Sequence, residues 1–291
     1  MKQTIFTGSA TALVTPFTRD GGAVDLDLFE ALCNYQIAHG TDALVVAGTT
    51  GESPVLSRDE KIRLFYAAVK CADGRIPVIA GTGSNNTEQA VRNANDAEKQ
   101  GVNALLVVTP YYNKCTQEGL IKHYYYIADR VSASIIVYNV PSRTGVNIFP
   151  ETYKVLSAHK RIAAVKEANG NISAISETRR LCGDALAVYS GNDDQTAPIL
   201  ALGGKGVISV AANIIPDVMH EMAADAEKSA DLQIEYDRLL KAMFCEVNPI
   251  PVKAAMEAIW NHPFPLRLPL TAISAKNRIY INNLLNTYEL L

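Results

Sequence analysis

Cysteine, histidine and long hydrophobic runs are scarce in this sequence, and each scarcity excludes a class of protein. The five cysteines are far apart and odd in number, so a disulfide-linked secreted domain is not expected. Five scattered histidines offer no visible ligand set, so we expect neither a metal nor another cofactor. No apolar stretch reaches the roughly 20 residues that a membrane helix needs. The first residues also lack the features of a signal peptide, which favours a cytoplasmic location.

The excess of one sign of charge over the other is small as well. The 291 residues carry a formal net charge of −3, without a long run of like charges. Nucleic acids and membrane surfaces are bound through concentrated basic patches, so we expect neither partner. Hydrophobic residues make up 48% of the chain and charged residues 20%, which is typical of a soluble globular enzyme. The length suits one large α/β domain or two small ones.

Short apolar segments alternate with amphipathic ones along most of the chain. The apolar segments are residues 10–17, 43–50, 77–83, 104–112, 134–140, 163–167, 186–191 and 206–210. Their nearly continuous Val, Ile, Leu and Ala content is typical of strands buried on both faces. Helices are predicted between them, for example at residues 25–39, 57–72, 87–100 and 117–130. Eight strands alternating with helices predict a (β/α)8 TIM barrel, and a doubly wound open sheet is the alternative.

The alternation stops after residue 213. Residues 216–230, 232–245, 251–259 and 272–288 are predicted to be helical, with no further strand among them. The sequence therefore predicts a C-terminal helical appendage on the barrel. We place the catalytic barrel domain at residues 1–225 and the helical region at residues 226–291, without a flexible linker between them.

Lys166 is the residue that its surroundings explain least. It follows an Ile-Ala-Ala-Val run inside a predicted strand, where alternation would place Lys166 and Glu167 on opposite faces. Burial disfavours the charged form of a lysine and lowers its pKa from about 10.4. A neutral amine can attack a ketone carbonyl and form an imine. The alternative is a lysine that extends past the strand end into solvent.

Residues suited to the same chemistry stand at other predicted strand ends, where barrel enzymes carry their catalytic groups. Tyr138 ends the preceding strand, and its phenol can transfer protons during imine formation if another hydroxyl relays them. Such hydroxyls are available on Thr49, Thr50 and Tyr112. Arg143, five residues after Tyr138, can hold a carboxylate through paired hydrogen bonds. Each residue alone has a structural explanation, but together they predict a pocket for a small 2-oxo acid.

Five motifs coincide with these strand ends. They are GTTGE at 48–52, TPYYN at 109–113, YNVPSRTG at 138–145, VKEA at 165–168 and GVISV at 206–210. Together they resemble the dihydrodipicolinate synthase family, which belongs to the class I, pyruvate-dependent aldolases. NPIPVK at 248–253, in the helical appendage, also resembles the family pattern. The resemblance extends from about Gly8 to the C-terminal helices.

The resemblance implies a catalytic role for four residues. Lys166 would form the imine with pyruvate, and Tyr138 would donate and accept protons. Thr49 and Tyr112 would complete the proton relay, with Tyr112 reaching into the site of a neighbouring subunit. Family members are commonly homotetramers built as dimers of dimers, so we expect the same assembly here.

The resemblance also implies how two substrates are bound. Thr50 and the backbone around Ile208 would hold the carboxylate of pyruvate, and Gly191 would line the pocket. Arg143 would bind the carboxylate of the second substrate, aspartate 4-semialdehyde. The product would be 4-hydroxy-tetrahydrodipicolinate, made in the first committed step of diaminopimelate and lysine biosynthesis.

Other functions stay open at this point. A sister aldolase, such as an N-acetylneuraminate lyase or a 2-keto-3-deoxy sugar acid aldolase, would use the same imine chemistry. Thr49 and Arg143 follow the synthase pattern rather than the sialic-acid lyase pattern. A non-catalytic barrel that senses a 2-oxo acid would leave the imine machinery idle. A phosphate-binding barrel isomerase is disfavoured because residues 192–194, Asn-Asp-Asp, are acidic.

One departure from the family concerns feedback inhibition by lysine. Inhibited members bind lysine at the dimer interface with histidines and a glutamate, where this chain has Arg58, Lys61 and Gln89. Two cations would repel the ammonium groups of lysine, and glutamine removes a favourable negative charge. We therefore expect weak or absent inhibition by lysine.

Overall fold

A closed barrel of parallel strands forms the centre of the molecule. The computed structural model describes residues 4–291, and within them eight strands pair in chain order, with the last closing onto the first. The strands are β1 (Gly8–Ala12), β2 (Ala43–Val46), β3 (Val78–Gly81), β4 (Ala104–Val108), β5 (Ser134–Asn139), β6 (Ile162–Glu167), β7 (Ala187–Ser190) and β8 (Gly206–Ser209). The predicted (β/α)8 barrel is confirmed, and the open sheet is excluded because β1 pairs with β8.

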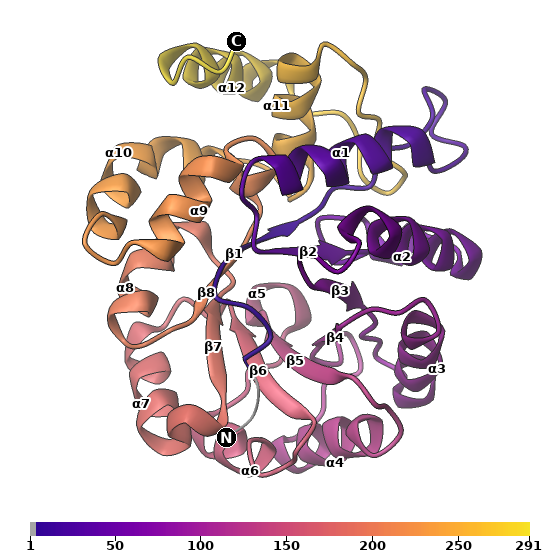
Figure 1. Cartoon of the computed structure of the whole chain (residues 1–291), viewed down its shortest axis with the longest axis vertical. Helices are drawn as coiled ribbons and strands as arrows, with labels where there is room; N and C mark the ends of the chain where they lie inside the picture. The colour runs from indigo at the N-terminus through magenta and orange to yellow at the C-terminus, as the bar shows by residue number, and fades with distance from the viewer. Residues whose placement is uncertain (1–3) are drawn as a thin grey trace.

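The helices surround the barrel and continue beyond it (Figure 1). The helices that connect consecutive strands are α1 (Leu26–Ala38), α2 (Arg58–Ala72), α3 (Thr87–Glu98), α4 (Gln117–Ala128), α5 (Pro141–Thr144), α6 (Pro150–Leu156), α7 (Ile172–Cys182) and α8 (Thr196–Ala201). They are followed by α9 (Pro216–Ala224), α10 (Ser229–Ala242), α11 (Ile250–Trp260) and α12 (Ala275–Thr287). Short 3₁₀ turns are η1 (Ser53–Val55), η2 (Gly183–Ala185), η3 (Asp193–Gln195) and η4 (Ala211–Asn213).

Several predicted strands end earlier than the sequence pattern suggested. The predicted strand at 10–17 ends at Ala12, and the one at 104–112 ends at Val108. The residues beyond these points are loops at the barrel mouth. Leu13 and Phe17 are nevertheless buried, so apolar content alone extended the prediction too far. The mouth loops, rather than the strands, therefore carry most of the GTTGE and TPYYN motifs.

The barrel interior is packed mostly with small and branched side chains. Alternate strand residues point inward and form one cluster. Small side chains such as those of Ala10, Ala43 and Ala164 let the strands close around a narrow interior. Phe6 stacks on Tyr189, with ring centroids 4.2 Å apart, and the Tyr189 hydroxyl donates to the Phe6 carbonyl. Because Phe6 precedes β1, this aromatic pair closes the N-terminal end of the barrel. A substrate must enter from the opposite end.

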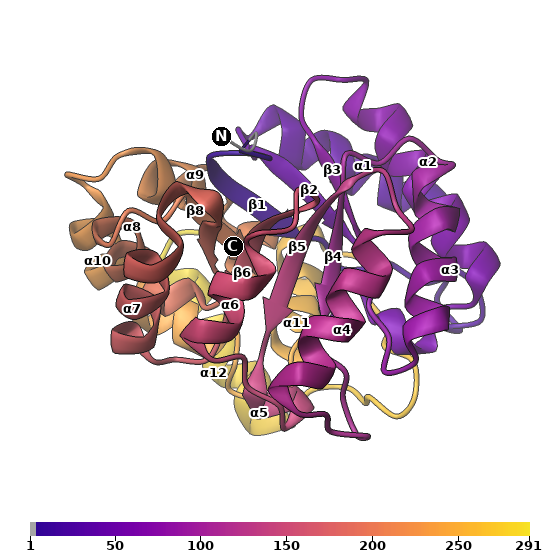
Figure 2. The same ribbon diagram turned by 90° about the horizontal axis from the view of Figure 1, so that it is seen from below.

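The C-terminal helices lie near that open end. Figure 2 shows α11 and α12 on the side toward which the arrow of β5 points. Helices α9 to α12 share an apolar cluster with Val14 and Val207 of the barrel. The appendage is therefore packed against the strand ends that carry the sequence motifs. No helix among the described residues is long and apolar enough to cross a membrane.

Candidate active site at the mouth of the barrel

Lys166 and Tyr138 lie side by side on neighbouring strands. They are register partners in β6 and β5, and the Lys166 Nζ is 4.5 Å from the centroid of the Tyr138 ring. Both side chains are buried. Burial lowers the pKa of Lys166 to about 8, although the carboxylate of Asp193 opposes this shift. The prediction of a buried lysine is confirmed, and the alternative of a lysine extending into solvent is wrong.

Glu167 points away from Lys166, as strand alternation predicted. Its carboxylate accepts hydrogen bonds from the Tyr153 hydroxyl at 2.7 Å and from Asn139 Nδ2 at 3.0 Å. Burial raises the pKa of Glu167 to about 7 despite these hydrogen bonds. Glu167 therefore forms its hydrogen bonds on the outer face of β6 and is not a partner of the lysine amine.

Thr49 contacts the phenol of Tyr138. The two side chains line the same cavity, and Thr49 reaches this position from the loop after β2. Burial raises the pKa of Tyr138, while nearby Arg143 and Thr49 oppose the shift. The phenol thus keeps its proton at neutral pH and can donate it. The structure brings together the lysine, the tyrosine and one of the predicted relay hydroxyls.

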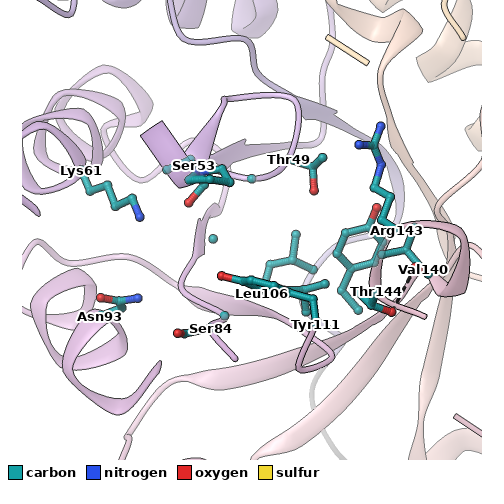
Figure 3. Close-up of a pocket in the computed structure, with 17 residues that line it drawn as sticks. Thr49, Ser53, Lys61, Ser84, Asn93, Leu106, Tyr111, Val140, Arg143 and Thr144 are labelled. Carbon is teal, nitrogen blue, oxygen red and sulfur yellow. Dashed lines mark hydrogen bonds between the residues drawn. The ribbon is translucent and has the colours of Figure 1, made fainter. Parts of the chain in front are cut away.

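A cavity of about 370 Å³ opens beside this group of residues. Figure 3 shows Thr49, Arg143 and Thr144 toward one end of it and Lys61 with Asn93 at the other. Tyr138 lines the cavity, whereas Lys166 lies against the Tyr138 ring and is not among the lining residues. The cavity is large enough for two small carboxylic acids, and Arg143 places a fixed positive charge in its wall.

Ile208 lies on β8 as the sequence predicted, whereas β7 ends at Ser190 and Gly191 is the first residue after it. A Cβ atom at Gly191 would lie 2.8 Å from the Ala168 Cβ, so only glycine fits beside β6. Ile208 is fully buried among the inward-facing residues of the barrel. Thr50 is also buried, and its hydroxyl accepts a hydrogen bond from Asn248 of the appendage.

Asp193, whose charge acts on the lysine, was not predicted from the sequence as a site residue. Asp193 is buried in η3 and accepts hydrogen bonds from the backbone amides of Val210 (3.1 Å) and Ala211 (2.9 Å). It thereby holds the loop after β8, and its charge raises the pKa of Lys166 against the effect of burial. The available signal was an acidic residue three positions after the end of β7, which in the sequence alone indicates only that phosphate binding is disfavoured.

Tyr112 lies outside the cavity of its own chain. Its side chain is 91% exposed, and its backbone has a φ of 69°, which is unusual for a residue with a Cβ atom. A strained and exposed aromatic residue next to a catalytic motif is typical of a functional position. One chain alone therefore does not bring Tyr112 to Tyr138.

The three residues at the inhibitor positions are not equivalent. Arg58 forms an ion pair with Asp96, with 2.6 Å between Nε and Oδ2, so much of its charge is compensated. Gln89 hydrogen-bonds with Asn93 and Arg92. Lys61 lines the cavity, burial lowers its pKa, and no carboxylate within residues 4–291 lies within 4.0 Å of its amine. The expected repulsion of lysine therefore rests on Lys61 more than on Arg58.

The fold and the site together define a class of protein. A (β/α)8 barrel in which a buried lysine on β6 lies beside a tyrosine on β5 offers an amine nucleophile and a proton donor to a carbonyl substrate, as Schiff-base lyase chemistry requires. The model of the dihydrodipicolinate synthetase family matches residues 5–288, and the chain belongs to this family. Within residues 4–291, no three His, Cys, Asp or Glu side chains group into a metal site.

Individual relatives agree with this assignment. The chain is 49% identical to a 4-hydroxy-tetrahydrodipicolinate synthase of Thermoanaerobacter sp. (strain X514), over 99% of this chain and 98% of the relative. It is similar to the crystal structure of dihydrodipicolinate synthase from Thermotoga maritima, with a TM-score of 0.96 and 46% identity over 99% of this chain and 100% of that one. It is also similar to the enzyme of Cyanidioschyzon merolae, solved with lysine bound, with a TM-score of 0.95 and 38% identity over 99% and 100% of the two chains.

Proposed function

We propose that this chain synthesises 4-hydroxy-tetrahydrodipicolinate through an imine between Lys166 and pyruvate. The activity is that of its family and of its curated relatives, and it belongs to lysine and diaminopimelate biosynthesis. The observation that carries the residue assignment is the buried Lys166 beside Tyr138 at the open end of the barrel. The imine then forms on a lysine whose pKa, about 8, leaves part of it neutral near physiological pH.

The chemistry follows from the neighbours of Lys166. The neutral amine attacks the carbonyl carbon of pyruvate, and the resulting carbinolamine loses water as Tyr138 supplies a proton. Loss of a proton from the methyl carbon gives an enamine, which attacks the aldehyde carbon of aspartate 4-semialdehyde. The amine of that substrate then attacks the imine carbon, closes the ring and frees Lys166. Thr49 relays protons to and from the phenol, whose pKa its hydroxyl lowers.

Carboxylate binding would use the residues around the cavity. Thr50 and the backbone near Ile208 hold the pyruvate carboxylate in the narrow barrel mouth, and Gly191 lines the pocket. Arg143 binds the carboxylate of aspartate 4-semialdehyde from the cavity wall. Two anchors for two carboxylates orient the enamine toward the aldehyde, which lowers the entropic cost of the carbon–carbon bond-forming step.

Tyr112 supports a proposal about assembly. Its exposed, strained position suits a residue that completes the relay of a neighbouring copy. We place the enzyme in the cytoplasm as a homotetramer, a dimer of dimers, in which each barrel at residues 1–225 is supported by its helical region at 226–291. Sedimentation of the purified protein would measure the oligomeric state, and a monomer that is fully active would contradict the role of Tyr112.

An assay with two alternative aldehydes tests the proposed function. Purified enzyme is given pyruvate with either aspartate 4-semialdehyde or N-acetylmannosamine, and product formation is followed by coupled absorbance. We expect turnover with aspartate 4-semialdehyde alone. Turnover with N-acetylmannosamine would assign the chain to the sister aldolases, and pyruvate binding without turnover of either would indicate a sensor.

The pKa of Lys166 predicts how activity depends on pH. Only the neutral amine attacks pyruvate, so kcat/KM for pyruvate should rise with pH and level off above the pKa of about 8. The neutral fraction rises from about one tenth at about pH 7 to about nine tenths at about pH 9. Asp193→Asn tests the effect of the neighbouring charge, because removing the carboxylate should lower the pKa of Lys166 and move the inflection to lower pH. An inflection near the ordinary lysine value of about 10.4 would contradict the burial effect.

Resistance to lysine is the expected consequence of Lys61. Its amine, without a nearby carboxylate, repels the ammonium groups of lysine at the end of the cavity. Activity should be measured across a lysine titration with both substrates near their KM. A submillimolar inhibition constant would contradict the prediction. Lys61→Gln removes the charge and should strengthen any residual inhibition, whereas Arg58→Gln should change it less because Asp96 already compensates Arg58.

A further inference from the structure

We propose that Asn248 is a positioning residue whose side-chain amide orients the Thr50 hydroxyl toward the carboxylate of pyruvate. The proposal rests on the proposed function, since it assumes that Thr50 binds pyruvate. Asn248 belongs to the NPIPVK motif, in the segment between α10 and α11. That segment reaches the barrel mouth from nearly 200 positions further along the chain than Thr50.

The hydrogen bond between these two residues has a direction that matters. Asn248 Nδ2 donates to Thr50 Oγ1 at 3.0 Å, and both side chains are buried. A threonine hydroxyl has one proton and two lone pairs. Because the amide occupies a lone pair, the hydroxyl proton is left to donate elsewhere. A carboxylate can only accept hydrogen bonds, so this arrangement presets Thr50 as a donor to pyruvate.

The carbonyl oxygen of the Asn248 side chain indicates that stability alone does not explain an asparagine at this position. Asn248 is only 6% exposed, and within residues 4–291 its Oδ1 is buried without a hydrogen-bond partner. Burying an unpaired acceptor costs free energy, which a smaller apolar side chain would avoid. This free-energy cost of the unpaired Oδ1 occurs at a position where Nδ2 of the same side chain hydrogen-bonds with Thr50. This is the pattern expected when a buried polar group serves a functional site.

The backbone of Asn248 makes a separate contact with the second anchor. Its carbonyl oxygen accepts a hydrogen bond from Arg143 Nη2 at 3.4 Å. A side-chain substitution removes the amide that holds Thr50 but keeps this carbonyl. The two anchors can therefore be separated experimentally, since the side chain of Asn248 acts on pyruvate and its backbone acts on aspartate 4-semialdehyde.

The segment that carries Asn248 is fastened at a second point. Lys253 of the same motif forms a buried ion pair with Glu52, two residues after Thr50. The appendage and the loop after β2 are thus joined at residues 50 and 52. This double attachment holds the loop that carries Thr50 against the appendage.

Asn248→Ala tests the proposal through a difference between the two substrates. We expect the KM for pyruvate to rise about fivefold to tenfold, which corresponds to one lost hydrogen bond. The KM for aspartate 4-semialdehyde should stay within about twofold, as should kcat. The pyruvate concentration that half-saturates borohydride-trapped adduct should rise by the same factor. Equal increases in both KM values, or an unchanged pyruvate KM, would overturn the proposal.

Two further variants distinguish positioning from a merely structural role. If Asn248 acts through Thr50, the double variant N248A/T50V should have the pyruvate KM of Thr50→Val alone, and additive effects would contradict this. Asn248→Asp keeps the size of the side chain but can accept the Thr50 proton, so it should weaken pyruvate binding more than alanine does. Asp also serves as the test if the alanine variant does not fold. Failure of the wild-type enzyme to form any pyruvate adduct would instead contradict the proposed function.

Discussion

Lys166→Arg should lower kcat by at least about a thousandfold and abolish the covalent adduct with pyruvate. Arginine keeps a positive charge and a similar length, but its guanidinium does not lose a proton at any pH that the protein tolerates. The imine therefore cannot form, and every later step depends on it. Measurements of kcat by the coupled assay and of protein mass after borohydride reduction with pyruvate would check both parts of this expectation.

Lys160→Arg is a matched control for this substitution. Lys160 precedes the other end of β6 and is exposed, so the same chemical change there should leave both activity and adduct unchanged. Peptide mapping of the reduced wild-type enzyme should find the added mass on the peptide that contains Lys166. An adduct on a different lysine, or an arginine variant that still traps pyruvate, would refute the assignment of the nucleophile.

The sequence predicted those features of the fold that depend on neighbouring residues. Each barrel strand is a short apolar run, so all eight strands were found in the correct order. The environment of Lys166 was also predictable, because alternation along β6 is a local property that separates Lys166 from Glu167. Tyr138 could be placed beside Lys166 because consecutive strands of a barrel are neighbours.

Contacts between distant parts of the chain could not be predicted in this way. Asp193 reaches Val210 and Ala211 across two strand ends, and Asn248 reaches Thr50 from the helical appendage. Neither pairing leaves a periodic signal, since it depends on how loops fold over the barrel mouth. The roles of Gly191 and Ile208, the pyruvate contact of Thr50, the intersubunit role of Tyr112 and the particular substrate of Arg143 came from family resemblance, and they stay predictions for mutagenesis.

Breaking the buried ion pair between Lys253 and Glu52 should cause the largest loss of stability. Both side chains are 1% exposed, and Lys253 Nζ also donates to the Pro265 carbonyl at 2.8 Å and lies 4.3 Å from the centroid of the Phe17 ring. Lys253→Met would leave the Glu52 carboxylate buried without its main cation. Removal of one partner of a buried pair typically costs about 3–5 kcal/mol. The midpoint of urea-induced unfolding measures this loss.

The double variant Glu52→Gln with Lys253→Met separates the cost of an unpaired charge from the loss of packing. If the unpaired carboxylate causes the instability, neutralising it should restore much of the stability that Lys253→Met removes, so the two effects should not add. Lys122→Met provides a comparison, because Lys122 pairs with Glu118 on the exposed face of α4 and should change the midpoint little. A Lys253→Met variant as stable as the wild type would show that the pair is not needed to hold the appendage. Since Glu52 follows Thr49 and Thr50 in the same loop, we also expect the single variant to bind pyruvate more weakly at temperatures where it remains folded.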